Sequence, residues 1–157
     1  SAMAAVSGHP PDITKEIRMR CMAIIKASPE SEAGILPSER QLTAMGAFNQ
    51  ELLNAGVLLG GEGLHPSARG LRLQLDAHGS RVTSGPFAAT GELIAGFWLL
   101  QVNSLDDAVA WLKRMPNPDN APIEIELRPV FEAEDFGTAL TSEAGALEDA
   151  LRQQLAH

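Results

Sequence analysis

Alternating hydrophobic and polar positions predict most of the β-strands in this chain. Residues 17–26 place apolar side chains on one face, whereas the other face is apolar in its middle and charged at its ends. Two short alternating runs separated by a turn at 77–80 predict a β-hairpin, whose first strand we expect to be half-buried. A continuous apolar run at 93–102 is typical of a central strand covered on both faces. The predicted strands cover residues 17–26, 57–59, 71–76, 81–83, 93–102 and 123–127.

Apolar side chains at helical spacing predict three helices. The first opens around Pro37, which suits a first turn, and closes at Gly56, a residue that readily becomes left-handed. The second is capped by Ser104 and ends before Pro116. The third, 142–155, is polar with a leucine at every fourth position, so it is either peripheral or packed on a partner subunit.

The order of these elements predicts an α+β domain with a ferredoxin-like arrangement. Two helices can cover only one face of such a sheet. The other face includes Met22 and Ile24, so it needs a second copy of the chain, and we expect a homodimer. Residues 1–15 are expected to form a disordered tail with a tag remnant, 16–137 the α+β domain and 138–157 a C-terminal helix.

Composition narrows the possible partners. The chain has 12 Lys and Arg against 20 Asp and Glu, a formal net charge of −8, so we expect neither nucleic acid nor a membrane surface as a partner. No apolar run is long enough to span a bilayer, and the amino terminus lacks the basic-then-apolar order of a secretory signal, so we expect neither export nor membrane spanning. The one cysteine, Cys21, fits a reducing compartment, and we expect a cytoplasmic protein in which it is a small buried hydrophobe.

One acid and base pair can be nominated from the sequence. Glu62 and His65 lie three residues apart in a glycine-rich segment expected to be a loop, where a carboxylate could orient an imidazole as a general base. The alternative is that Glu62 accepts backbone donors in the turn and that His65 is exposed. His9, His78 and His157 lie in the tail, a turn and the terminus, so we expect no metal site and no cofactor.

Three segments together resemble the YCII-related family, in particular its DGPF-domain branch of YciI-like proteins. The resemblance covers residues 18–137. It implies ferredoxin-like protomers that pair into a dimeric α+β barrel. The segments are Gly60-Gly61-Glu62-Gly63-Leu64, Ser84-Gly85-Pro86-Phe87, and the helix 105–114 that leads to Glu126-Leu127-Arg128-Pro129-Val130.

The same resemblance weakens the case for an enzyme. Some YCII proteins carry a His and Asp pair proposed to be catalytic, and by rough alignment these positions hold Met45 and Met115 here. Neither methionine can transfer a proton. Ser84 replaces the aspartate of the namesake tetrapeptide, and turn formation by Gly85 and Pro86, with Phe87 filling the core, is the favoured interpretation of this loop.

Two functions of different classes remain open. The favoured one is a small-molecule-binding or accessory domain with an apolar pocket in the dimer. The alternative is a small hydrolase or lyase that acts on cyclic or aromatic metabolites through Glu62 and His65. Core packing of Phe48 and Trp98 is the simpler interpretation of those two residues. For Arg128 it is pairing with Glu126 of a neighbour or with Glu92. The pocket is expected to be lined by Phe48, Phe87 and Trp98, with Ser84 as a further ligand-binding residue and with Glu62 and Arg128 at its polar end.

Overall fold

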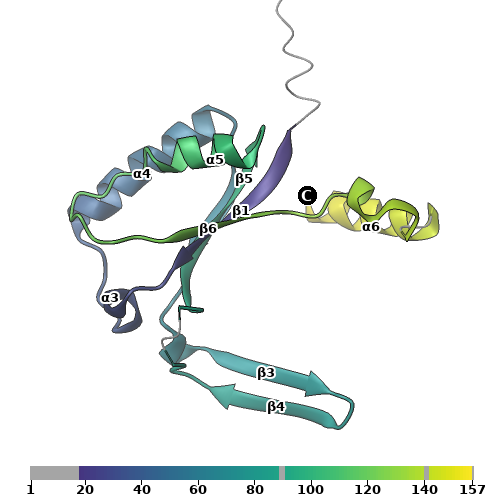
Figure 1. Ribbon diagram of the computed structural model, residues 1–157, viewed down its shortest axis with the longest axis horizontal. Helices are drawn as coiled ribbons and strands as arrows, with labels where there is room; N and C mark the ends of the chain where they lie inside the picture. The colour runs from purple at the N-terminus through teal and green to yellow at the C-terminus, as the bar shows by residue number, and fades with distance from the viewer. Residues whose placement is uncertain (1–17, 89–90, 140–141, 157) are drawn as a thin grey trace, which may run out of the picture.

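Four antiparallel strands form the central sheet of the computed structural model, which describes residues 18–88, 91–139 and 142–156. They lie in the order β2-β5-β1-β6, so β5 and β1 are the inner strands (Figure 1). The strands are β1 (Met19–Lys26), β2 (Leu58–Gly63), β5 (Ile94–Val102) and β6 (Ile125–Pro129).

Two helices, α4 (Glu39–Asn54) and α5 (Leu105–Leu112), pack on one face of this sheet. The predicted cap is confirmed for α5, since the Ser104 side chain accepts a hydrogen bond from the backbone of Asp107. In α4 the cap is Ser38, so Pro37 lies just before the helix rather than in its first turn. A short helix, α3 (Pro29–Glu32), lies between β1 and α4 and was not among the three predicted helices.

The buried core lies between the sheet and these two helices. Cys21 is fully buried within it, and burial raises the pKa of its thiol, which confirms the expectation of a small buried hydrophobe. The rings of Phe48 and Trp98 meet edge to face in the same cluster, with centroids 6.0 Å apart. The buried side chains are Cys21, Ala23, Phe48, Leu52, Val57, Trp98, Leu100, Val102, Ala108 and Leu112.

The opposite face of the sheet has no helical cover in the described part of the chain. Strand register brings Met22 opposite Leu99 and Ile24 opposite Phe97, so the centre of this face is apolar. All four side chains are only partly buried. The expectation that β5 is covered on both faces is therefore wrong for the single chain, and we call this surface the open face.

Two elements project away from the sheet (Figure 1). The predicted hairpin is confirmed as β3 (Leu71–Asp76) and β4 (Gly79–Ser84), which form a separate two-stranded sheet. All residues of both strands are exposed, so the expectation of a half-buried strand is wrong. The C-terminal helix α6 (Ser142–Leu155) follows β6 and the short helical turns η2 (Ala133–Ala139).

The α+β class is confirmed, with a sheet that is antiparallel throughout the described residues and does not close into a barrel. The tail predicted over residues 1–15 lies outside the described residues. Among the helices that the structure describes, none is long and apolar enough to cross a membrane.

Candidate functional site

Glu62 lies in a strand rather than in the predicted loop. It belongs to the edge strand β2, is exposed, and pairs in register with Phe97, so its position is on the open face. The neighbouring glycine serves close approach between strands: a Cβ atom on Gly61 would lie 2.8 Å from the Trp98 ring. Gly61 is therefore the position of this run that lets β2 pack closely against β5.

His65 does not contact Glu62. Within the described residues no hydrogen bond or ion pair joins the two side chains. The exposed His65 ring instead lies 3.2 Å from the guanidinium of Arg69, which belongs to the short helical turn η1 (Ser67–Arg69). A single chain does not assemble the nominated pair, so the acid and base hypothesis stays a prediction.

The segment that joins β4 to the rest of the chain is a tight connection. The Gly85 amide donates to the Gly70 carbonyl at 2.9 Å, and the Gly85-Pro86 peptide bond is cis. Ser84 is exposed at the end of β4. Phe87 is half-buried and lies outside the core that we expected it to fill; the Arg72 guanidinium stacks over its ring, 4.0 Å from the centroid.

A carboxylate and a hydroxyl hold this connection in place. Glu32 of α3 accepts two hydrogen bonds from Ser67, one from the hydroxyl at 2.6 Å and one from the amide at 3.0 Å. The Ser67 hydroxyl in turn accepts from the Phe87 amide at 3.0 Å. The sequence analysis missed this network, because Glu32 and Ser67 lie 35 positions apart and carry no local signal of a contact.

The network predicts a pH dependence of stability. Hydrogen bonds from the Ser67 hydroxyl and amide lower the pKa of Glu32, so its contribution is present above the ordinary glutamate pKa of about 4.3 and is lost as the pH falls through the lowered folded value. We expect Glu32→Gln to be less stable than the unaltered protein at pH 7, with the gap narrowing below about pH 4. Urea denaturation across this range measures it, and a constant gap would contradict the assignment. Glu30→Gln, a neighbour with no such bonds, is the control.

The remaining predicted residues divide between the two faces of the sheet. Phe48 and Trp98 lie in the helix-covered core, where the Trp98 indole donates to the Asn49 side chain at 3.0 Å. Arg128 is exposed on β6 and pairs with Glu126 at 3.1 Å. Strand register puts both of these charged residues on the open face, opposite Met22 and Ile24.

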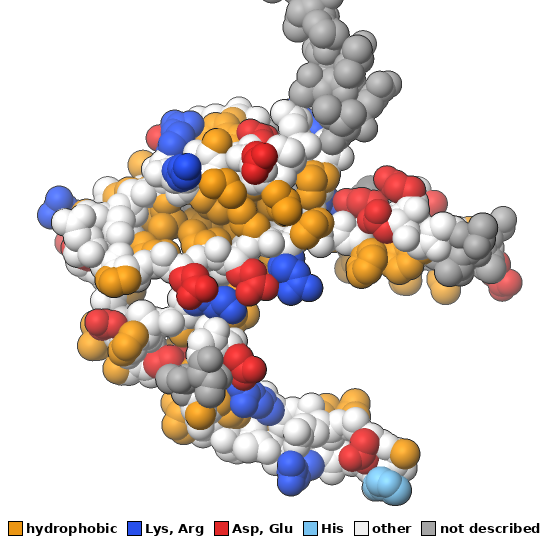
Figure 2. Space-filling view, in the orientation of Figure 1, with side chains coloured by type: hydrophobic (Ala, Val, Ile, Leu, Met, Phe, Trp, Pro, Cys, Tyr) orange, Lys and Arg blue, Asp and Glu red, His pale blue; other side chains and the backbone are white. Residues whose placement is uncertain are grey.

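Glu126 is the centre of a charged edge on the open face. It contacts Arg128 through one carboxylate oxygen and Lys26 through the other, at 3.2 Å. The hydrogen bonds from Arg128 and Lys26 lower the pKa of Glu126. Figure 2 shows the acidic and basic side chains gathered under β6, facing the hollow above the hairpin. The open face thus has Glu62 at one edge and a mixed-charge group at the other.

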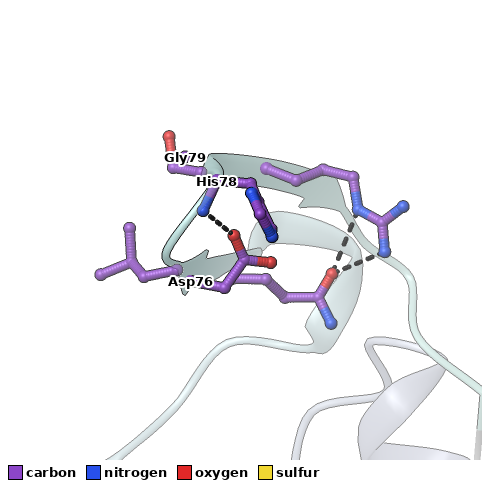
Figure 3. Close-up of a pocket in the computed structure, with 7 residues that line it drawn as sticks. Asp76, His78 and Gly79 are labelled. Atoms are coloured by element: carbon purple, nitrogen blue, oxygen red, sulfur yellow. Dashed lines mark hydrogen bonds between the residues drawn. The ribbon is translucent and has the colours of Figure 1, made fainter.

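A second hollow lies at the tip of the hairpin, where turn geometry accounts for its polar contacts. Asp76 accepts from the His78 amide at 2.7 Å, and Arg81 donates to Gln74 across the strands (Figure 3). An aspartate that caps its own turn in this way is ordinary hairpin chemistry. Among the described residues no cluster of three His, Cys, Asp or Glu side chains could hold a metal ion.

Comparison with known proteins agrees with the motifs. The profile of the YCII-related domain matches residues 19–134, which include the whole sheet, both covering helices and the hairpin. The chain is also similar to the uncharacterized protein R00369 of Rhizobium meliloti (strain 1021), at 30% identity over 92 residues that make up 59% of this chain and 74% of that protein.

Proposed function

The chain belongs to the YCII-related domain family, and from this membership and the open face of its sheet we propose that it works as a homodimer that binds a small molecule between its subunits. The strand order and the two crossover helices are those of a ferredoxin-like protomer. Two such protomers that bring their open faces together form an α+β barrel. The Ser84-Gly85-Pro86-Phe87 segment supports placement in the DGPF branch.

The observation that carries this proposal is the apolar centre of the open face. Met22, Ile24, Phe97 and Leu99 lie side by side on the two inner strands, partly exposed, with no helix over them in the described chain. Exposed apolar surface of this kind is costly in water and marks an interaction site. A second open face would cover it and leave the charged edges at the rim.

The geometry changes which residues serve the proposed site. Phe48 and Trp98 pack in the core between the sheet and the helices, so they do not line the proposed site. Phe97 and Leu99 lie on the open face and would line it instead. Glu62 and Arg128 were expected together at one polar end of the pocket, but strand register puts them at opposite edges of the same face. An apolar floor with charged edges favours a small cyclic or aromatic molecule that carries a polar group.

A charge on the open face should break the dimer. We expect the unaltered protein to scatter light at about twice its 16.7 kDa chain mass at micromolar concentration. Leu99→Glu is expected to weaken association at least about a hundredfold, since each chain would bury an unpaired carboxylate. Val109→Glu on the exposed side of α5 is the control and should stay dimeric. A persistent monomer, or a Leu99→Glu dimer, would contradict the proposal.

Ligand binding is tested with a panel of small cyclic and aromatic carboxylic acids. A compound that binds the folded dimer is expected to stabilise it by about 2.7 kcal/mol at a hundred times its Kd. Arg128→Gln should lose this shift, whereas Arg152→Gln on α6 should keep it. No shift for any compound would favour the accessory role without a ligand. Turnover of small lactones that Glu62→Gln and His65→Ala abolish would favour the hydrolase alternative instead.

A further inference from the structure

One outer strand of the open face, β2, carries a carboxylate without a partner. A Cβ atom on Gly61 would point at the Trp98 ring, which lies in the core, so the next residue, Glu62, faces the open side. Glu62 is exposed, and within the described residues no ion pair includes its carboxylate. Strand β2 itself contains no basic residue that could neutralise this charge.

The opposite outer strand, β6, offers the complementary charge. Arg128 is 69% exposed and contacts Glu126 through one guanidinium nitrogen, Nη1, at 3.1 Å. The same carboxylate also contacts Lys26, so two cations share it. Glu124 lies at the Lys26 end of this group, where its carbonyl accepts from the Lys26 amide. Within the described residues the other guanidinium nitrogens of Arg128 have no acidic partner.

Two open faces can be brought together in two limiting orientations. A twofold axis along the strands reverses the strand order of the second chain, so β2 of one chain lies over β6 of the other (Figure 1). An axis across the strands places each strand over its own copy. Both orientations cover the apolar centre, because its four side chains lie on the two inner strands. Burial of apolar surface therefore does not choose between them.

Charge does choose between them. With the axis across the strands, the two copies of Glu62 come to the same rim of the interface, and like charges that face each other there are costly. With the axis along the strands, Glu62 instead lies over β6 of the second chain, level with Glu126, since strand register puts both in one row across the sheet. Arg128 is two residues, about 7 Å, further along β6. An arginine side chain is long enough to close that distance.

We propose that the two open faces pair about a twofold axis along the strands, so that Glu62 of one chain meets Arg128 of the other on each side of the interface. The inference rests on the homodimer of the proposed function and adds how its ligand site is built. Strand register keeps these side chains apart within one chain, whereas the dimer joins them at a common polar end. The site is thus incomplete in a single chain, and each dimer contains two equivalent copies of it.

Charge reversal tests the pairing. Glu62→Arg and Arg128→Glu are each expected to raise the dissociation constant of the dimer about tenfold or more, because repulsion replaces attraction on both sides. The chain with both reversals restores an opposite-charge contact on each side. Its dissociation constant should therefore return to within about threefold of that of the unaltered protein. Analytical ultracentrifugation over a dilution series measures all four proteins.

A matched control uses an arginine outside the proposed contact. Arg152 is also exposed and pairs with a glutamate of its own element, α6. Glu62→Arg combined with Arg152→Glu has the same net charge as the double reversal above, but it should dimerise as weakly as Glu62→Arg alone. Urea denaturation of the dilute proteins checks that each variant folds, which we expect because all three altered side chains are exposed.

The outcomes separate this arrangement from the dimer itself. If the double reversal stays as weak as the single ones while the unaltered protein dimerises, the dimer stands and the composite site is refuted. Equal rescue by Arg152→Glu would show a general effect of net charge, which also overturns the pairing. A Glu62→Arg chain that binds the unaltered chain as tightly as the Arg128→Glu chain would indicate the axis across the strands. A monomeric unaltered protein would refute both proposals.

A second measurement reverses no charge. Glu62→Gln and Arg128→Gln each remove one partner of the same contact, so we expect the double variant to lose less affinity than the product of the two single effects. Glu62→Gln combined with Arg152→Gln, which alters two separate places, should show simple multiplication. Multiplicative losses for the 62 and 128 pair as well would contradict a direct contact between them.

Discussion

Replacing Gly85 with valine is expected to lower the free energy of unfolding by about 3 kcal/mol or more. A Cβ atom at this position would lie 1.8 Å from the carbonyl oxygen of Ser67, so the backbone on one side must move. That movement would also disturb the bonds that the Ser67 hydroxyl makes with Glu32 and Phe87. Thermal denaturation should show a loss of about 10 °C in Tm.

Two control variants isolate the cause. Gly46→Ala makes a smaller change in the open surface of α4, where nothing lies within 4 Å of the added atom, and should stabilise the protein by up to about 1 kcal/mol. Ser84→Ala, on the exposed residue just before Gly85, should be close to neutral. If Gly85→Val melts with the unaltered protein, the connection is not the tight contact described above.

The elements with local signals could be predicted from the sequence. Helix α5 begins at its serine cap, and α4 ends before a glycine whose φ is +75°. The alternating residues also predict the hairpin, although its turn is two residues shorter than the predicted 77–80, since Asp76 pairs with Gly79. In each case the information lies within a few neighbouring positions, which is what a pattern of residues can express.

Features that depend on distant contacts could not be predicted. The glycines of β2 suggest a loop by composition, and only the close approach of β5 to Gly61 shows why a glycine is needed at that position of the strand. Gly85 has an ordinary negative φ, so it is required by the nearby Ser67 carbonyl rather than by a left-handed backbone, which is the usual reason for a glycine in a turn. The exposure of the hairpin leucines likewise could not be predicted, because it depends on which other elements of the chain lie near them.

For the same reason, the sequence could not show which of the candidate pocket residues lie on the open face. Residues 93–102 are apolar throughout, so periodicity cannot say which of Trp98 and Leu99 faces the helices. The position of α4 decides it: Trp98 contacts Phe48 and Asn49, and Leu99 turns to the open face. The large aromatic ring favoured Trp98 as a pocket residue, whereas its smaller neighbour Leu99 lies on the surface proposed to bind a ligand.

Truncation of these two neighbours, Trp98 and Leu99, should lower the free energy of unfolding by different amounts. Trp98→Ala removes a ring that is 5% exposed, its edge contact with Phe48 and the hydrogen bond to Asn49, so we expect a loss of about 3 to 5 kcal/mol. Leu99→Ala removes a partly exposed side chain and should cost about 1 kcal/mol in the dilute, dissociated protein.

Denaturation at two protein concentrations separates the roles. The loss in Trp98→Ala should be similar at low and high concentration, because it concerns the core of each chain. The loss in Leu99→Ala should grow with concentration, because dimerisation stabilises the unaltered protein by mass action and this variant gains less from it. Val109→Ala, which shortens an exposed side chain on α5, controls for truncation itself. Trp98→Ala that is as stable as Leu99→Ala in dilute solution would contradict the packing role of the indole and return it to the list of candidate ligand contacts.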